Sequence, residues 1–216
     1  MEFANFLTKT KDFLIRRITE LFGLLIVVFA FLIFVSIFSY SPNDPNFIIS
    51  KTDQIQNIMG LRGSILSDFL FQSVGLIAYL IPVTLFFSGA NIIINKKNII
   101  FIDNIFFCLL YIISGSIFFS YFKDQSFFLT VNGNGGFIGL FLKESFLYSL
   151  IEINENISYY TLAILTIFLF LVSINFKISK TLTFIRFLKN LSISKKEVDV
   201  QDYENIKKEN IFSENI

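Results

Sequence analysis

The stretch LFGLLIVVFAFLIFVSIFSY, residues 21–40, contains no charged residue and decides the class of this protein. A helix of this length is about 30 Å long at 1.5 Å per residue, which matches the hydrocarbon core of a bilayer. The run exceeds the apolar core of a signal peptide, and no small-residue cleavage pattern follows it. We therefore predict a membrane-spanning helix that remains in the protein as an anchor.

The residues that follow this span, SPNDPNF at 41–47, end the helix with two prolines. Pro42 and Pro45 lack an N–H group and disfavour helical backbone in the residues before them. Asp44, between them, is expected to accept hydrogen bonds from its own following backbone, as aspartates in turns do. The pattern predicts a structural turn outside the membrane.

The composition of the whole chain is that of an integral membrane protein. Of its 216 residues, 54% are hydrophobic, 30 are Phe and only 16% are charged, which lies outside the usual range of soluble domains. Histidine is absent and Cys108 is the single cysteine, so most metal ligands and catalytic pairs are missing. We expect no metal, no cofactor and no catalytic residue, and we interpret Cys108 as a small apolar residue.

Three further apolar stretches are long enough to cross a bilayer. The fold class predicted from them is an all-α integral membrane bundle of four transmembrane helices, at about residues 21–40, 69–94, 99–122 and 157–176. Pro82 falls near the middle of the second span, where a kink is tolerated if neighbouring helices satisfy the freed carbonyl. Asp103 lies near the first turn of the third span. An interfacial position is favoured for it, and an ion or proton pathway is the alternative.

The distribution of Lys and Arg predicts the orientation. Four precede the first span, two form the Lys96–Lys97 link and eight follow the fourth span, whereas the two long connections hold four together. By the positive-inside rule, both termini are cytoplasmic and the long connections face outward.

The two flanks of the membrane domain, residues 21–176, are expected to differ. Residues 1–20 carry apolar positions near one helical face and predict an amphipathic helix on the cytoplasmic leaflet. A charged flank that only orients the first span is equally compatible with this pattern. Residues 177–216 begin as a basic juxtamembrane segment and then lose any apolar period, which predicts the start of a disordered linker.

A glycine-rich stretch before the last span, NGNGGFIGLFLKESFLYSLI at 132–151, predicts an extra amphipathic or re-entrant segment at 137–151. With Lys143 and Glu144, this segment is too charged to form a stable transmembrane helix. Gly135 and Gly139 would share one helical face and allow another backbone to approach closely. The glycines lack the spacing of a phosphate-binding loop.

Together these elements resemble the four-span N-terminal membrane domain of FtsK-type cell-division DNA translocases. The resemblance covers about residues 14–180, with Asn46 where the family typically has Ser and an aromatic Phe47 in place of the usual Trp. The motif positions fall in the first outer turn, around the entry and body of the second span, and before the last span: Pro42, Asp44, Pro45, Phe47, Gly60, Gly63, Gly75, Pro82, Gly135, Gly136 and Gly139.

The resemblance implies a membrane anchor of the bacterial inner membrane, placed at the division septum in cell division and chromosome segregation. Its expected partners are the lipid bilayer, further copies of itself and other cell-division membrane proteins. In the family, a linker tethers an ATP-driven DNA motor. No Walker A lysine, motor or DNA-binding winged helix occurs in these 216 residues. Neither ATP nor nucleic acid is therefore expected to bind, and the chain is expected to be a fragment or a split gene product. The alternative is an unrelated small polytopic protein, such as a transporter subunit.

Overall fold

A computed structural model describes residues 2–46, 54–96, 99–123, 129, 131–145 and 147–176. Within these residues the chain is helical and contains no strand. The elements in chain order are α1 (Glu2–Phe38), α2 (Gly60–Val74), a short 3-10 helix η1 (Gly75–Leu80), α3 (Ile81–Asn95), α4 (Ile99–Phe122), α5 (Gly136–Lys143), α6 (Leu147–Glu152) and α7 (Glu155–Ser173). The linker predicted at 177–216 and motif residue Phe47 lie outside the described residues.

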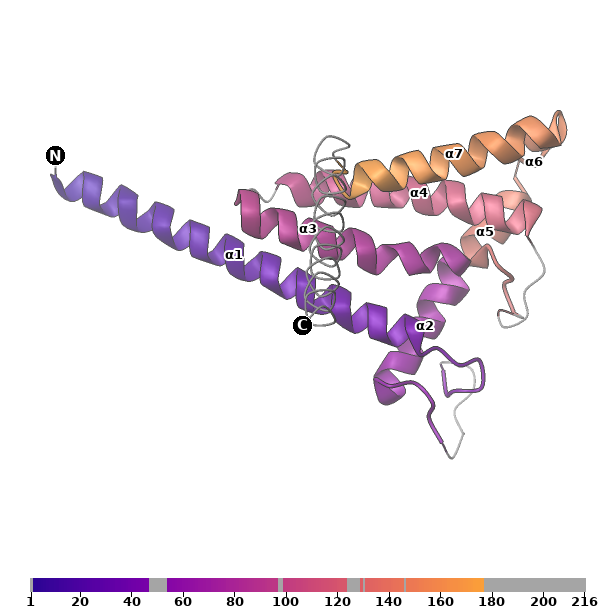
Figure 1. Cartoon of the computed structure of the whole chain (residues 1–216), viewed down its shortest axis with the longest axis horizontal. Helices are drawn as coiled ribbons and strands as arrows, with labels where there is room; N and C mark the ends of the chain where they lie inside the picture. The colour runs from indigo at the N-terminus through magenta and orange to yellow at the C-terminus, as the bar shows by residue number, and fades with distance from the viewer. Residues whose placement is uncertain are drawn as a thin grey trace, which may run out of the picture. The chain divides into compact units, whose positions relative to one another are not determined.

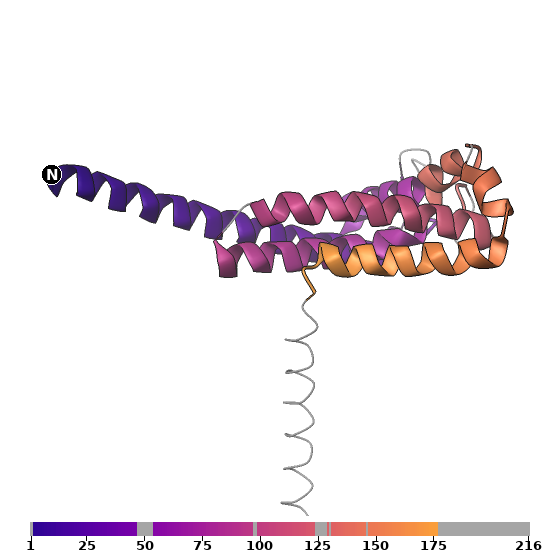
Figure 2. The same cartoon turned by 90° about the horizontal axis from the view of Figure 1, so that it is seen from above.

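Residues 1–175 form one compact unit built around four long apolar helical segments. The segments with the length and hydropathy of a membrane span are Thr8–Phe38, Gly60–Asn95, Phe101–Phe122 and Glu155–Ser173. In this unit α3, α4 and α7 run lengthwise beside one another, and α1 packs along α3 (Figures 1 and 2). The predicted all-α class with four membrane helices is confirmed. We call the end that holds the last turns of α1 and α4 the outer end, after its predicted side.

Helix α1 is one continuous helix of 37 residues, with no break at the predicted boundary at residue 20. Its buried positions begin at Thr19 and recur every three or four residues, which places them on one face of the helix: Thr19, Gly23, Ile26, Ala30, Ile33, Ser36 and Ile37. Before Thr19, every described side chain is exposed. The predicted surface helix therefore continues directly into the first span, and its position on the leaflet remains a prediction.

A close glycine contact and an ion pair contribute to the packing of α1 along α3. Gly23 and Gly89 face each other so closely that a Cβ on either would lie within 3.0 Å of the carbonyl oxygen of the other. Small residues allow this kind of close helix packing in membranes. At the opposite end from the outer turns, the Glu20 carboxylate pairs with Lys96 Nζ at 2.9 Å and with Arg17 at 2.6 Å.

The second span, expected at about residues 69–94, consists of three consecutive helical segments, α2, η1 and α3. Helix α2 stops at Gly75, whose φ of 71° and ψ of −149° suit only glycine. The chain then forms η1 and turns into α3, so α2 is inclined steeply to α3 (Figure 1). Pro82 lies in the first turn of α3, where a missing N–H breaks no helical hydrogen bond. The break in the helix is thus at Gly75, before Pro82.

The apolar core lies toward the outer end, where α1, α2, η1 and α4 meet. Phe71 and Tyr111 are completely buried there, and Tyr40 packs its ring against Phe71 with 4.7 Å between ring centroids. Elsewhere large apolar side chains cover the outside of α1, α4 and α7. Such an exterior is unfavourable in water and is typical of helices surrounded by lipid.

Candidate functional site

The motif residues form two clusters at the outer end, with Pro82 apart from both. The first, which we call the docked turn, contains Pro42, Asp44 and Pro45 and is bound to the first turns of α2 through Ser64, close to Gly60 and Gly63 in the chain. The second, which we call the glycine junction, is formed by Gly75, Gly135, Gly136 and Gly139. Residues far apart in the chain are therefore adjacent in the fold.

Asp44 organises the docked turn from a buried position. Its side chain is 2% exposed, and its two carboxylate oxygens accept hydrogen bonds from the backbone N–H groups of Gln56 and Asn57, both at 2.8 Å. Hydrogen bonds from backbone N–H groups to a carboxylate are among the stronger ones in proteins. Asp44 thus ties the beginning of the outer loop to its end. The expected local bonds to its own following backbone are replaced by bonds to residues much later in the loop.

Hydroxyl and amide groups attach this loop to α1 and α2. Asn57 Nδ2 donates to the Ser36 carbonyl at 2.9 Å, and Ser36 Oγ donates to the Gly63 carbonyl at 2.5 Å. Ser64 Oγ donates to the Pro45 carbonyl at 2.6 Å. A Cβ on Gly63 would collide with the Asn57 side chain. Gly63 is therefore required for packing, and the turn is a fixed part of the fold.

The glycine junction brings two backbone segments into direct contact. Leu76 N–H donates to the Asn134 carbonyl at 2.9 Å. A Cβ on Gly75 would lie within 3.0 Å of the Asn134 and Gly135 backbone, and one on Gly136 would lie equally close to the backbone of Val74 and Gly75. Gly75 and Gly136 also have positive φ values, 71° and 64°. Only glycine satisfies both conditions without strain.

Helix α4 closes the other side of the glycine junction. Gly135 and Gly139 both face Ser116 and Ser120, and a Cβ on either would come within 3.0 Å of atoms of these serines. Ser116 Oγ donates to the Val74 carbonyl at 3.0 Å, so the same helix also holds the end of α2. Gly135 and Gly139 therefore both lie close to the backbone of α4.

A second polar arrangement, which sequence reasoning missed, lies between α3, α4 and α7. Thr84 Oγ1 is 3.1 Å from both Tyr111 OH and Ser173 Oγ, and all three residues are completely buried. Toward the end opposite the outer turns, Asn104 Nδ2 donates to Ser88 Oγ at 2.8 Å, and Asn175 Nδ2 donates to Asn104 Oδ1. We call these groups, together with the Thr166–Ser114 pair, the polar ladder.

The polar ladder holds α7 to the rest of the bundle. The buried residues of α7 itself are Thr166 and Ser173, and both make side-chain hydrogen bonds to another helix. Interhelical hydrogen bonds of this kind stabilise helix pairs where no hydrophobic driving force exists. The signal was present in the sequence, since Thr84 and Ser88 are four residues apart, as neighbours on one helical face are.

Asp103 does not belong to this ladder. It precedes the buried Asn104, and its own side chain is exposed on the outside of α4. Cys108 is buried and its thiol contacts Tyr111 OH at 3.3 Å. Across the residues that the structure describes, no group of three or more Cys, Asp and Glu side chains could hold a metal ion. The chemistry of the ladder is that of hydroxyl, amide and thiol groups, which suits helix packing.

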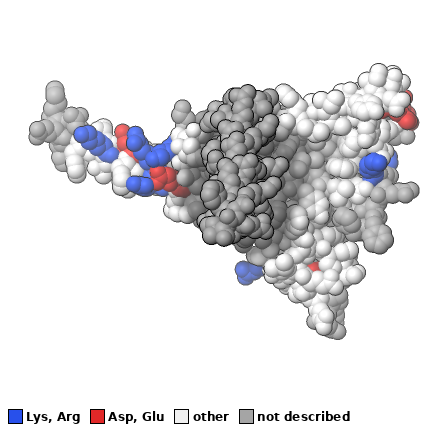
Figure 3. Space-filling model, viewed as in Figure 1, with Lys and Arg blue, Asp and Glu red and all other residues white. Residues whose placement is uncertain are grey.

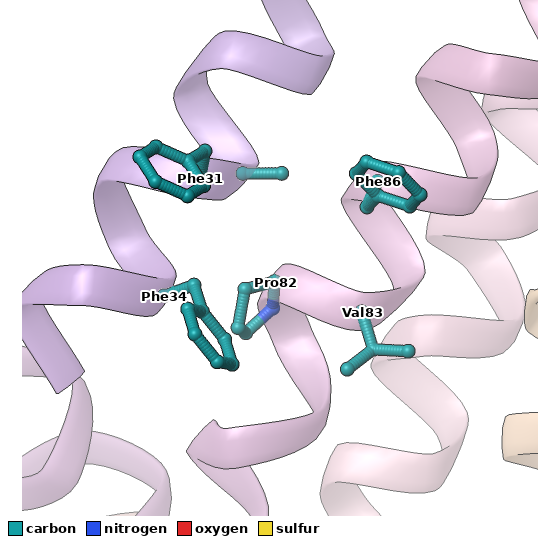
Figure 4. A pocket seen from close by; sticks show the side chains of 6 residues that line it. Phe31, Phe34, Pro82, Val83 and Phe86 are labelled. Carbon is teal, nitrogen blue, oxygen red and sulfur yellow. The ribbon is translucent and has the colours of Figure 1, made fainter. Parts of the chain in front are cut away.

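An apolar groove of about 200 Å³ lies between α1 and α3 near Pro82, in the first turn of α3. Phe31 and Phe34 of α1 line one side, and Pro82, Val83 and Phe86 of α3 line the other (Figure 4). The exposed outer rings make this part of the lipid-facing surface. Pro82 shapes this groove and contributes to neither cluster of motif residues.

Comparison with known proteins identifies the family to which these features belong. Residues 15–188 match the family described as the 4TM region of DNA translocase FtsK/SpoIIIE. DNA translocase FtsK of Rickettsia typhi is 36% identical over 108 residues, which are 50% of this chain and 14% of the relative. The same protein of Rickettsia prowazekii gives the same identity and shares. That of Rickettsia bellii is 43% identical over 53 residues, 24% of this chain and 7% of the relative.

No solved structure matches the chain. The stretches aligned with the curated relatives are at most about a seventh of the length of those proteins. The family match, in contrast, extends from within α1 to beyond α7 and so includes the docked turn, the glycine junction and the polar ladder. The chain therefore belongs to the family of four-helix membrane regions of FtsK/SpoIIIE DNA translocases.

Proposed function

We propose that this chain is a membrane anchor that places an FtsK-type DNA translocase at the division septum, in cell division and chromosome segregation. The observation that carries the proposal is the family match across all the spanning helices. Membership in this family also excludes the alternative of an unrelated small polytopic protein.

The proposed role is non-catalytic. The relatives named DNA translocase match this chain in only a small part of their length. The match lies in the membrane region, and the sequence of this chain contains no phosphate-binding loop. DNA translocation and ATP hydrolysis would then belong to a motor outside these residues. Further copies of the chain and other division proteins are the proposed protein partners.

The proposed orientation places both termini in the cytoplasm of a bacterial inner membrane. The charge distribution of the sequence supports it through the positive-inside rule. On the face seen in Figure 3, coloured side chains gather at the left-hand end of the molecule, and a few others lie at the right-hand end and along the lower edge. The Glu20–Lys96 ion pair belongs to the end that this orientation assigns to the cytoplasm.

A fluorescent fusion at the C-terminus tests both location and orientation in dividing bacteria. We expect a fluorescent band at midcell, because the fusion would fold in the cytoplasm and follow the anchor to the septum. Two membranes meet at a septum, so the intensity of the band must be divided by that of a lipophilic dye in the same cells. A ratio at midcell equal to that along the side wall would contradict septal targeting.

An alkaline phosphatase fusion at the same terminus is the matched control for orientation, since that enzyme is active only outside the cytoplasm. We expect a fluorescent and phosphatase-inactive C-terminus. Phosphatase activity there would show that the C-terminus lies outside the cytoplasm and would contradict the proposed orientation. It would not test septal targeting.

A further inference from the structure

Helix α5 has two unlike faces. Its buried residues, Gly136 and Gly139, face the glycine junction. On the opposite side Phe137 and Phe141 are 61% and 64% exposed, and their rings stack with 6.3 Å between centroids. Residues four apart share a helical face, so the two rings form one apolar patch. The patch therefore lies on the side of α5 that faces away from the glycine junction.

The depth of α5 follows from its contacts with α4. Gly135 and Gly139 pack on Ser116 and Ser120, which belong to the last two turns of a helix that ends at Phe122. At 1.5 Å per residue, α4 is about 36 Å long and exceeds a hydrocarbon core of about 30 Å by about 3 Å at each end. Contacts about 3 to 9 Å from the end of α4 therefore place α5 at the outer hydrocarbon boundary.

Exposed apolar surface also continues from the spanning helices to the segment that follows α5. Leu150 and Ile151 of α6 line an apolar groove of about 290 Å³ together with Ile157, Thr161 and Leu162 of α7. Leu150 and Ile157 are themselves 54% and 63% exposed. The lipid-facing surface of α7 thus extends to the α5–α6 region at the same end of the bundle (Figure 1).

We propose that α5 is an interfacial anchor that inserts Phe137 and Phe141 into the outer leaflet of the bilayer. The glycine contacts with α4 set the depth of α5 in the bilayer. At this depth the two exposed rings are surrounded by acyl chains and not by water. Lys143, at the end of α5, donates from Nζ to the Ser120 carbonyl at 3.3 Å and holds this end of the helix to α4. The occupant of the patch is lipid, as for other amphipathic helices that lie at the membrane interface. The inference is independent of septal targeting.

The test uses the absence of tryptophan from the chain. The full chain is reconstituted in phosphatidylcholine vesicles as single-tryptophan variants Phe137→Trp and Phe141→Trp, which keep an exposed aromatic ring in place. Fluorescence quenching is measured with aqueous iodide and with lipids brominated at two depths. Asn43→Trp, at an exposed polar position in the docked turn, is the water reference, and Ile164→Trp, exposed at the middle of α7, is the hydrocarbon reference.

We expect the iodide quenching constants at 137 and 141 to be several-fold lower than at 43. Lipids brominated near the headgroup end should quench both positions more than lipids brominated at the chain terminus, with the opposite order at 164. Equal iodide quenching at 137, 141 and 43 would overturn the proposal and leave the patch free for a protein partner. Labelling of Phe137→Cys and Asn43→Cys variants with a water-soluble maleimide gives a second measurement, in which equal labelling rates would also overturn the proposal.

Discussion

The glycine junction and the polar ladder join helices of the same bundle in different ways. In the junction, backbone meets backbone, and Gly75 and Gly136 leave no room for a Cβ. In the ladder, side chains such as Thr84 and Ser173 meet through single hydrogen bonds. Close packing allows little relaxation, whereas each hydrogen bond between membrane helices contributes little on average. Substitutions in the junction should therefore cost far more than substitutions in the ladder.

The largest effect is expected from Gly136→Ala compared with Gly60→Ala. Both glycines have φ of 64°, but a Cβ on Gly60 meets nothing within 4 Å, whereas one on Gly136 meets the backbone of Val74 and Gly75. The left-handed conformation costs about 1–2 kcal/mol for an ordinary residue. Overpacking should add about 1–3 kcal/mol at Gly136 alone. Thermal unfolding in detergent micelles measures the difference.

The Gly60→Ala variant serves as the control because it shares the backbone strain and lacks the collision. Equal losses of stability in the two variants would show that the close contact at the glycine junction contributes nothing. That result would contradict the expectation that substitutions in the glycine junction cost more stability than substitutions in the polar ladder.

An intermediate effect is expected from Asp44→Asn in the docked turn. The amide keeps one acceptor oxygen, so one of the two backbone N–H groups, on the exposed Gln56 or the buried Asn57, loses its partner. An unsatisfied buried group costs about 1–3 kcal/mol. Limited proteolysis should cut the outer loop faster. Asn43→Ala, at an exposed neighbour, should leave the rate unchanged, and equal rates for all three proteins would mean that Asp44 does not hold the loop.

A smaller effect is expected in the polar ladder from a double-mutant cycle of Thr84→Val and Ser173→Ala. The two hydroxyl groups are 3.1 Å apart and belong to α3 and α7. Such pairs in membrane proteins couple by about 0.6 kcal/mol on average. Unfolding of the single and double variants measures the coupling. A coupling as large as the loss at Gly136 would remove the proposed difference between junction and ladder.

The smallest effect is expected from Asp103→Asn. Its side chain is exposed on α4 and lies outside both clusters and the ladder. An exposed substitution of this kind changes stability by less than about 0.5 kcal/mol. Thermal unfolding and the midcell fluorescence of the fusion should both be unchanged. Loss of the midcell band with normal stability would assign Asp103 a functional contact that the anchor proposal does not include.

Much of the fold class could be predicted from the sequence because hydropathy acts locally. A long apolar run such as residues 21–40 must form its own backbone hydrogen bonds in lipid, so it must be helical wherever it packs. The same argument applies to each of the four spans. The break at Gly75 could not be predicted in this way, because a glycine within an apolar run is compatible with a continuous helix. In the fold, Gly75 lies against the backbone of Asn134, and the next residue, Leu76, donates to the Asn134 carbonyl.

The motif residues also divide into features that the sequence predicted and contacts that only the fold shows. The sequence indicated that Gly135 and Gly139 would permit close packing, because they share one face of a helix. It contained no indication that Ser116 and Ser120 would be the surface they meet. It also predicted local hydrogen bonds for Asp44, whereas the structure uses the carboxylate to bind Gln56 and Asn57.

What the sequence determined by itself is therefore the all-helical membrane class with four spans, since both depend on the polarity of consecutive residues and the thickness of a bilayer. The tertiary structure alone decided which partner each polar or small residue meets: Gly75 with Asn134, Asp44 with Gln56 and Asn57, and Thr84 with Tyr111 and Ser173. These pairings join residues distant in the chain, and their geometry exists only once the helices have packed. Hydropathy is a property of each segment, whereas packing depends on several segments at once.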